Sequence, residues 1–77
     1  MMSKDNQINF NKKLAKIKIA NKISNALKEQ NIKKQDFAML LNKQNSVISL
    51  WLKGEHNFSV DTLIEIEYVL NINLLTQ

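Results

Sequence analysis

Apolar residues recur at helical spacing from Phe10 onward, whereas residues 1–9 are polar and show no period. Lysines fill the intervals between the first apolar positions, which are Leu14, Ile17, Ile23 and Leu27. We therefore predict a mobile tail over residues 1–9 and a helix over residues 21–30. The pattern leaves open whether residues 10–30 form one long helix or two pieces that meet near residue 21.

Two short helices are predicted next, separated by about three residues. Asn31 is expected to end the preceding helix and Asn42 to lie in the turn, because asparagine tolerates the left-handed backbone conformation better than most residues. The first short helix has a predicted buried face of Phe37, Ala38, Leu40 and Leu41. The second has a predicted buried face of Val47, Ile48, Trp51 and Leu52, and Gly54 should follow its end.

A last long helix is predicted after a short loop. Ser59 is a favourable N-cap residue, and Asn71 is a third asparagine at a predicted helix end. The helix between them is expected to bury Leu63, Ile64, Ile66, Val69 and Leu70. A final apolar turn follows it and contains Ile72, Leu74 and Leu75.

The composition favours helices and one small core. The 77 residues include no cysteine, no proline and one glycine, so disulfides and cysteine-bound zinc are excluded and few tight hairpin turns are available. We predict an all-α, compact bundle of four to five helices. No apolar run approaches the roughly 18 residues of a membrane span, so we expect a soluble, cytoplasmic protein that does not bind a membrane.

The charge is distributed unevenly along the chain. The net charge is +4, but residues 1–34 carry nine lysines against two acids, whereas residues 35–77 carry two lysines against five acids. A basic half of this kind attracts a phosphate backbone, an anionic lipid or an acidic protein, or is simply a solvated face. An enzyme is disfavoured because the chain has one histidine, His56, no arginine and no glycine-rich phosphate loop.

Residues 34–53 meet the requirements of a helix-turn-helix. Ala38 is small where two helices must approach, Asn42 can form the turn, and Ile48 and Trp51 can anchor the second helix. Over about residues 21–75, the chain resembles the Cro/CI-type (XRE) family of regulators through Phe37-Ala38, Leu41, Ile48, Trp51, Gly54 and Thr62-Leu63. The stretch Trp51-Leu52-Lys53-Gly54, followed by His56-Asn57-Phe58 and Thr62-Leu63, is similar to HigA-type antitoxins, which repress their own operon and bind a toxin.

The resemblance implies a lambda-repressor-like fold that binds double-stranded DNA without a cofactor, metal or catalytic residue. Its base-reading positions correspond to Asn45, Ser46, Ser49 and Leu50, and its phosphate-contacting position at the start of the first short helix corresponds to Lys34. Lys43, Gln44 and Lys53 are further candidates for phosphate contact because they flank the predicted recognition helix. Plainer interpretations are that Asn45 and Ser46 cap a helix, that Trp51 is a core anchor and that His56 is a loop residue. We divide the chain into residues 1–20, a basic tail or helical extension, and residues 21–77, the DNA-binding domain.

We therefore predict a sequence-specific transcriptional regulator, with a repressor favoured. The alternatives are an antitoxin whose main role is to bind a toxin, and a protein-interaction module. A homodimer is expected because one small domain reads few base pairs. The first choice of interface is Ile72, Leu74 and Leu75, and the second is the stripe of Phe10, Leu14 and Ile17.

Overall fold

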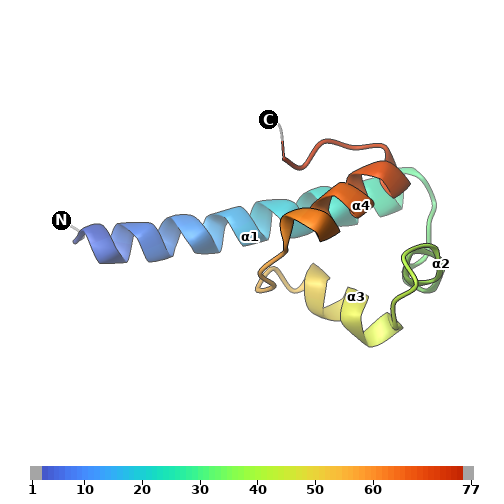
Figure 1. Cartoon of the computed structure of the whole chain (residues 1–77), viewed down its shortest axis with the longest axis horizontal. Helices are drawn as coiled ribbons and strands as arrows, with labels where there is room; N and C mark the ends of the chain where they lie inside the picture. Colours follow the sequence, from blue (N-terminus) through green and yellow to red (C-terminus); the bar gives the residue numbers. More distant parts are fainter. Residues whose placement is uncertain (1–2, 76–77) are drawn as a thin grey trace.

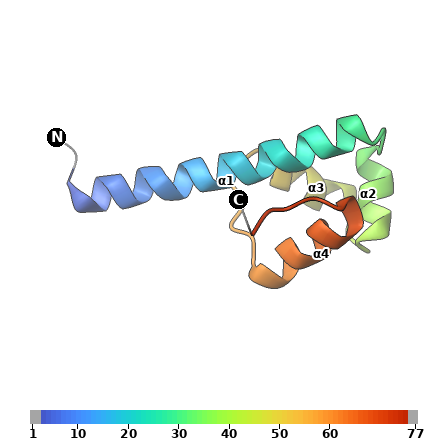
Figure 2. The ribbon, with the colours of Figure 1, turned by 90° about the horizontal axis from the view of Figure 1, so that it is seen from above.

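The computed structural model describes residues 3–75, which form four helices and no strand. They are α1 (Lys4–Glu29), α2 (Lys34–Leu40), α3 (Asn45–Leu52) and α4 (Val60–Leu70). Helices α2, α3 and α4 gather against the C-terminal half of α1, while its N-terminal half projects from the bundle (Figures 1 and 2). The radius of gyration is 13.5 Å, compared with about 11.5 Å for a compact domain of this length. The all-α prediction is confirmed, with a projecting helical arm.

Helix α1 is one continuous helix, which resolves the question left open by the sequence. Its N-cap is Ser3, whose hydroxyl oxygen accepts a hydrogen bond from the backbone N–H of Asn6 at 3.2 Å. Asp5 lies in the first turn, where its negative charge interacts favourably with the positive end of the helix dipole. The prediction of a mobile tail is therefore wrong for residues 4–9, and residues 1 and 2 lie outside the described part.

The core collects one or two large side chains from every helix. The fully buried ones are Ile23 from α1, Phe37 from α2, Ile48 from α3, and Ile66 and Leu70 from α4. Each such burial contributes about 1.5–3 kcal/mol. Trp51 is also buried, with its ring edge against Phe37 at a centroid distance of 6.3 Å, so the prediction of a core anchor is confirmed.

Two predicted core residues are on the surface. Leu40 and Ile64 are 61% and 51% exposed. The centre of the buried face of α2 lies between Phe37 and Ala38, and Leu40 is turned well away from it. Ile64 follows the buried Leu63 by one position, which rotates it by about 100° around α4. Both predictions were wrong because the apolar residues of α2 and α4 cover a wider arc of each helix than the part that the core buries.

Three of the four helices end at an asparagine in the left-handed conformation, as predicted. The φ angles of Asn31, Asn42 and Asn71 are 56°, 57° and 54°. After α1, the backbone N–H of Ile32 donates a hydrogen bond to the carbonyl oxygen of Leu27 at 2.9 Å. This bond gives a partner to one of the carbonyl groups that the end of the helix leaves unpaired. Gly54, just after α3, has a φ of 83°, and the cap at Ser59 is also confirmed by a bond from the N–H of Thr62 at 3.2 Å.

The segment after α4 folds back along the bundle. The carboxylate of Glu67 accepts hydrogen bonds from the backbone N–H groups of Leu74 and Leu75, at 2.5 and 2.9 Å. These bonds, with a smaller contribution from the charge of Lys22, lower the pKa of Glu67. Ile72 and Leu74 pack half-buried against the core. The first-choice dimer residues are therefore partly used within the monomer.

Candidate nucleic-acid interface

Helices α2 and α3 are joined by a tight, hydrogen-bonded turn. The backbone N–H of Lys43 donates to the carbonyl of Ala38 at 2.8 Å, and the N–H of Asn42 donates to the carbonyl of Met39 at 3.1 Å. The left-handed conformation of Asn42 makes both bonds possible. Ala38 is buried and its small side chain lets the two helices approach. The turn thus fixes the direction of α3 relative to α2.

Helix α3 presents a mostly polar face to solvent. Ile48 and Trp51 hold its opposite side in the core. The N-cap of α3 is Gln44, which makes no side-chain capping bond, and Asn45 is the first helical residue. The interpretation of Asn45 and Ser46 as caps is therefore not supported, and both side chains are free to contact a ligand.

The structure brings together the four positions that were assigned to base reading. Asn45, Ser46 and Leu50 are exposed, and Ser49 is half-buried between them. At 100° per residue, all four lie within one side of the helix. They form a row of amide, hydroxyl and methyl groups without a formal charge. Such groups can bond base edges and contact a thymine methyl.

Lysines lie near both ends of this helix. Lys43 lies in the turn before α3, Lys53 is its C-cap residue, and both are exposed, as is Gln44. Lys34 lines a shallow groove together with Lys28 and Lys33, beside the C-terminal end of α3. The predicted phosphate-contacting residues thus lie at both ends of α3.

Lys28 and Lys33 also line this groove, and neither was predicted as a phosphate contact. Lys28 belongs to the last turn of α1, whereas Lys33 is the N-cap residue of α2. The left-handed Asn31 reverses the chain between them, so residues of two helices line one groove. The sequence does predict that a helix ends at Asn31. A chain that turns there brings the lysines before and after Asn31 close to each other.

The loop after α3 packs through aromatic rings against Trp51, which lies on the buried side of α3. The ring of His56 lies 5.8 Å from that of Trp51 and 4.7 Å from that of Phe58, measured between centroids. His56 is therefore a packing residue in a loop. Within residues 3–75, no group of histidine, aspartate or glutamate side chains is arranged to hold a metal ion.

Comparison with known proteins decides the family. The sequence profile of the helix-turn-helix family matches residues 23–76, well over half of the chain. The chain belongs to the helix-turn-helix family, in its Cro/CI-type (XRE) form. The matched region contains the α2–turn–α3 unit and the core that supports it.

This helix-turn-helix protein is accordingly a DNA-binding regulator of the XRE type. No curated protein and no solved structure shows significant similarity to the chain. The projecting N-terminal half of α1 lies entirely before the matched region. No helix in residues 3–75 combines the length and apolar character needed to cross a bilayer.

Proposed function

We propose that the protein is a sequence-specific repressor that inserts α3 into the major groove of its operator. The observation that carries the proposal is the uncharged polar face of α3, which is flanked at both ends by lysines. A helix fits the major groove, and its N-terminal residues meet the base edges. Because a domain in the groove excludes other proteins from the same base pairs, binding within a promoter lowers transcription.

Asn45 and Ser46 occupy the first turn of α3 and read the bases deepest in the groove. An asparagine amide bonds the edge of adenine through two hydrogen bonds, while a serine hydroxyl serves several bases. One turn later, Ser49 adds a second hydroxyl, and Leu50 contacts a thymine methyl. This set of groups favours an operator rich in A·T pairs.

Lysines and polar groups at the two ends of α3 hold the phosphate backbone. The phosphate contacts assigned from the sequence are Lys34, Lys43, Gln44 and Lys53. Lys28 and Lys33 line the same groove as Lys34 and are added to them. If three to five phosphates are neutralised, the logarithm of the affinity falls with the logarithm of salt concentration at a slope of roughly −3 to −5 per protomer. The slope measures the number of these contacts.

Two copies bind one operator. A single α3 reads only a few base pairs, and a two-fold dimer places two such helices about one turn of DNA apart. The operator is therefore an inverted repeat. We further propose that residues 21–77 form the DNA-binding domain, with the preceding residues as its helical extension.

The testing experiment is fluorescence anisotropy of the protein with its own upstream region and with a scrambled duplex, at several salt concentrations. We expect at least a hundredfold preference for the native region, since specific binding typically exceeds non-specific binding by about 10³-fold or more. Equal, salt-driven binding to both duplexes, or no binding, would reject the proposal. Asn45→Ala is the matched variant, because it should remove the preference while leaving non-specific binding intact.

An antitoxin of the HigA type is a second candidate function. One observation favours it: the N-terminal half of α1 carries exposed apolar residues that the fold does not use, and an antitoxin needs a surface for its toxin beside the one for DNA. A toxin-like reading frame beside the gene, together with a stoichiometric complex on co-expression, would support this role. Absence of a complex with the product of every adjacent reading frame would reject it.

A further inference from the structure

The first half of α1 projects from the bundle and contacts the rest of the monomer at its base, where Ile17 lies beside Gly54 (Figure 1). We call residues 4–18 the arm; none of them is buried. A helix of about 15 residues is marginal in water by itself. The arm carries one continuous apolar stripe formed by Phe10, Leu14 and Ile17, which are 48%, 37% and 44% exposed. Lys13 and Lys18 lie on either side of the stripe.

Helix α4 carries a second exposed stripe of similar length. Val60, Ile64 and Tyr68 follow each other at four-residue intervals on its outer face and are 59%, 51% and 89% exposed. Asp61 and Glu65 each follow a stripe residue by one position, so they form an acidic edge along it. Both stripes extend about 10–12 Å along their helices.

The two surfaces match in chemistry as well as in length. The arm has five lysines and one acid, whereas α4 has three acids and no lysine. Two arms placed together would repel each other, but an arm placed on α4 joins an apolar stripe to an apolar stripe and positive charge to negative charge. The acidic edge also makes α4 unsuitable for contact with DNA.

We propose that the arm of each copy packs on α4 of a second copy, so that two reciprocal contacts form a two-fold dimer. This inference rests on the proposed need for two copies on one operator. Helix α4 runs beside the core part of α1, and its first residues face the side from which the arm projects (Figures 1 and 2). Two molecules arranged antiparallel therefore bring each arm across the other's α4.

The exposed area agrees with this assembly. The protein exposes 5949 Å², whereas a compact monomer of its mass of 8.9 kDa exposes about 4,800 Å². The excess of about 1,100 Å² is more than the roughly 800 Å² that each partner buries in a stable complex. Burying most of the arm would thus bring each copy close to the surface of a compact protein.

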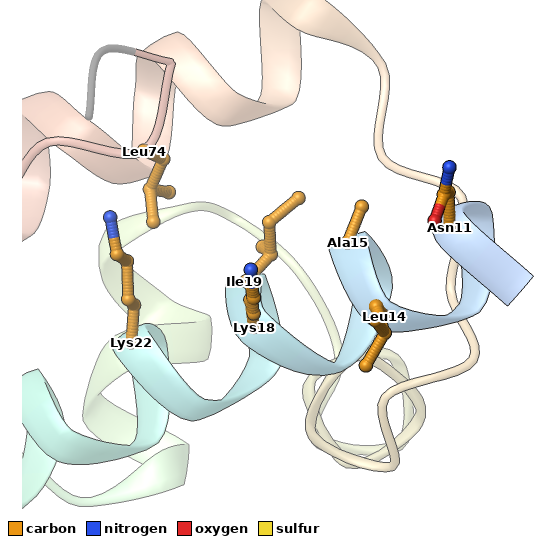
Figure 3. A pocket seen from close by; sticks show the side chains of 7 residues that line it. All are labelled: Asn11, Leu14, Ala15, Lys18, Ile19, Lys22 and Leu74. Atoms are coloured by element: carbon orange, nitrogen blue, oxygen red, sulfur yellow. The ribbon is translucent and has the colours of Figure 1, made fainter.

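The chain's own C-terminal segment covers a different side of α1. A groove between α1 and Leu74 is lined by Ala15, Ile19 and Lys22, and Leu14 lies at its margin (Figure 3). The side chains of Ala15 and Ile19 extend into this groove. The groove therefore leaves the outer part of the stripe, at Phe10 and Leu14, open to a second molecule, while Ile17 at the base of the arm lies beside Gly54.

The test uses opposite charge reversals in the full chain. Variant one carries Lys13→Glu and Lys18→Glu, and variant two carries Asp61→Lys and Glu65→Lys. Each places like charges across the proposed contact, so the dimer dissociation constant of each variant alone should rise at least about tenfold. Sedimentation equilibrium measures the constant without DNA, which separates this proposal from the proposed function.

Mixing the two variants gives the decisive result. In a mixed dimer, the acidic arm lies on basic α4 and the basic arm on acidic α4, so association should return to within a few-fold of the wild type. The matched control carries Lys4→Glu and Lys12→Glu, which reverses two charges on the other side of the arm and should leave the dimer unchanged. Circular dichroism verifies that every variant is folded; if Asp61→Lys unfolds α4, Glu65→Lys is mixed with Lys18→Glu instead.

Three outcomes would overturn the proposal. Tighter association of variant one alone would show that arms pair with arms, because their repulsion has been reduced. A mixture that does not associate would show that the reversed charges do not face each other. A wild type that is monomeric at all concentrations would exclude the second copy and leave a different protein as the occupant of the stripe.

Discussion

Replacement of Gly54 by alanine tests how closely α3 approaches α1. Gly54 has a φ of 83°, and an added Cβ atom would lie 3.3 Å from Cγ1 of Ile17. The left-handed conformation costs an alanine roughly 1–2 kcal/mol, and the close contact adds about 1 kcal/mol of overpacking. Alanine also reduces the entropy of the unfolded chain, which returns about 0.4–1 kcal/mol.

The net expectation is a loss of about 1.5–2 kcal/mol in the free energy of unfolding. For a domain of this size the melting temperature should fall by roughly 10 °C. Urea denaturation and thermal melting, both followed by circular dichroism, measure the two quantities. Asn25→Ala, at an exposed position in α1, is the matched control and should remain within about 0.5 kcal/mol of the wild type.

A double-mutant cycle separates the backbone contribution from the contact. In an Ile17→Ala background, the contacts left to the new Cβ atom are Cα of residue 17 at 3.5 Å and Cβ of Ala20 at 3.9 Å, both ordinary distances. Gly54→Ala should then cost only about 1 kcal/mol. An equal cost in both backgrounds would refute the close contact. A cost below about 0.5 kcal/mol in the wild type would also refute the conformational argument. All variants are compared at a concentration where each sediments as one species.

Four further changes test other parts of the structure. Asn45→Ala should cost about 1–3 kcal/mol of binding free energy on the preferred duplex and little on the scrambled one, as measured by anisotropy. Lys34→Ala should weaken binding to both duplexes and reduce the salt slope by about 1, and an unchanged slope would remove this lysine from the interface. Ser59→Ala should lower stability by about 1 kcal/mol in urea denaturation through loss of the N-cap of α4. Because the folded pKa of Glu67 lies below its ordinary value of 4.5, the bond to Leu74 stabilises the fold above that value and is lost as the pH falls through the lowered pKa; the amide shift of Leu74 should follow this titration, and Glu67→Gln should abolish it.

The helix ends and the outward face of α3 followed from the sequence because they depend on local chemistry. At residues 31, 42 and 71, an asparagine stands where a helical apolar pattern ends, and each of these asparagines has the left-handed conformation. Once Ile48 and Trp51 are assigned to the core, the helical period determines that Asn45, Ser46 and Leu50 point outward. Neither inference needed knowledge of how the helices pack.

The missed features depend on neighbours that lie outside the local window. Residues 4–9 are mostly polar and include three residues of low helix propensity, Asp5, Asn6 and Asn9, so their propensity for helix is weak. Their helix exists because Ser3 caps it and because it continues a helix already held by Ile23 and the core. The groove lined by Lys28 and Lys33 likewise appears only when α1 and α2 are placed together.

Because α1 is one unbroken helix, it sets a fixed distance and angle between the arm and the rest of the protein. Its 26 residues span about 39 Å without a hinge, so whatever holds the arm also fixes the position and angle of α3 through a rigid rod. Inserting a single alanine between residues 18 and 19 would shift the arm by only about 1.5 Å, but would rotate it by about 100° relative to the exposed polar face of α3. In the proposed dimer, the arm should therefore tolerate substitutions that preserve its helix, its charge and its apolar stripe, but no change in its length. The spacing of the operator half-sites should be correspondingly strict.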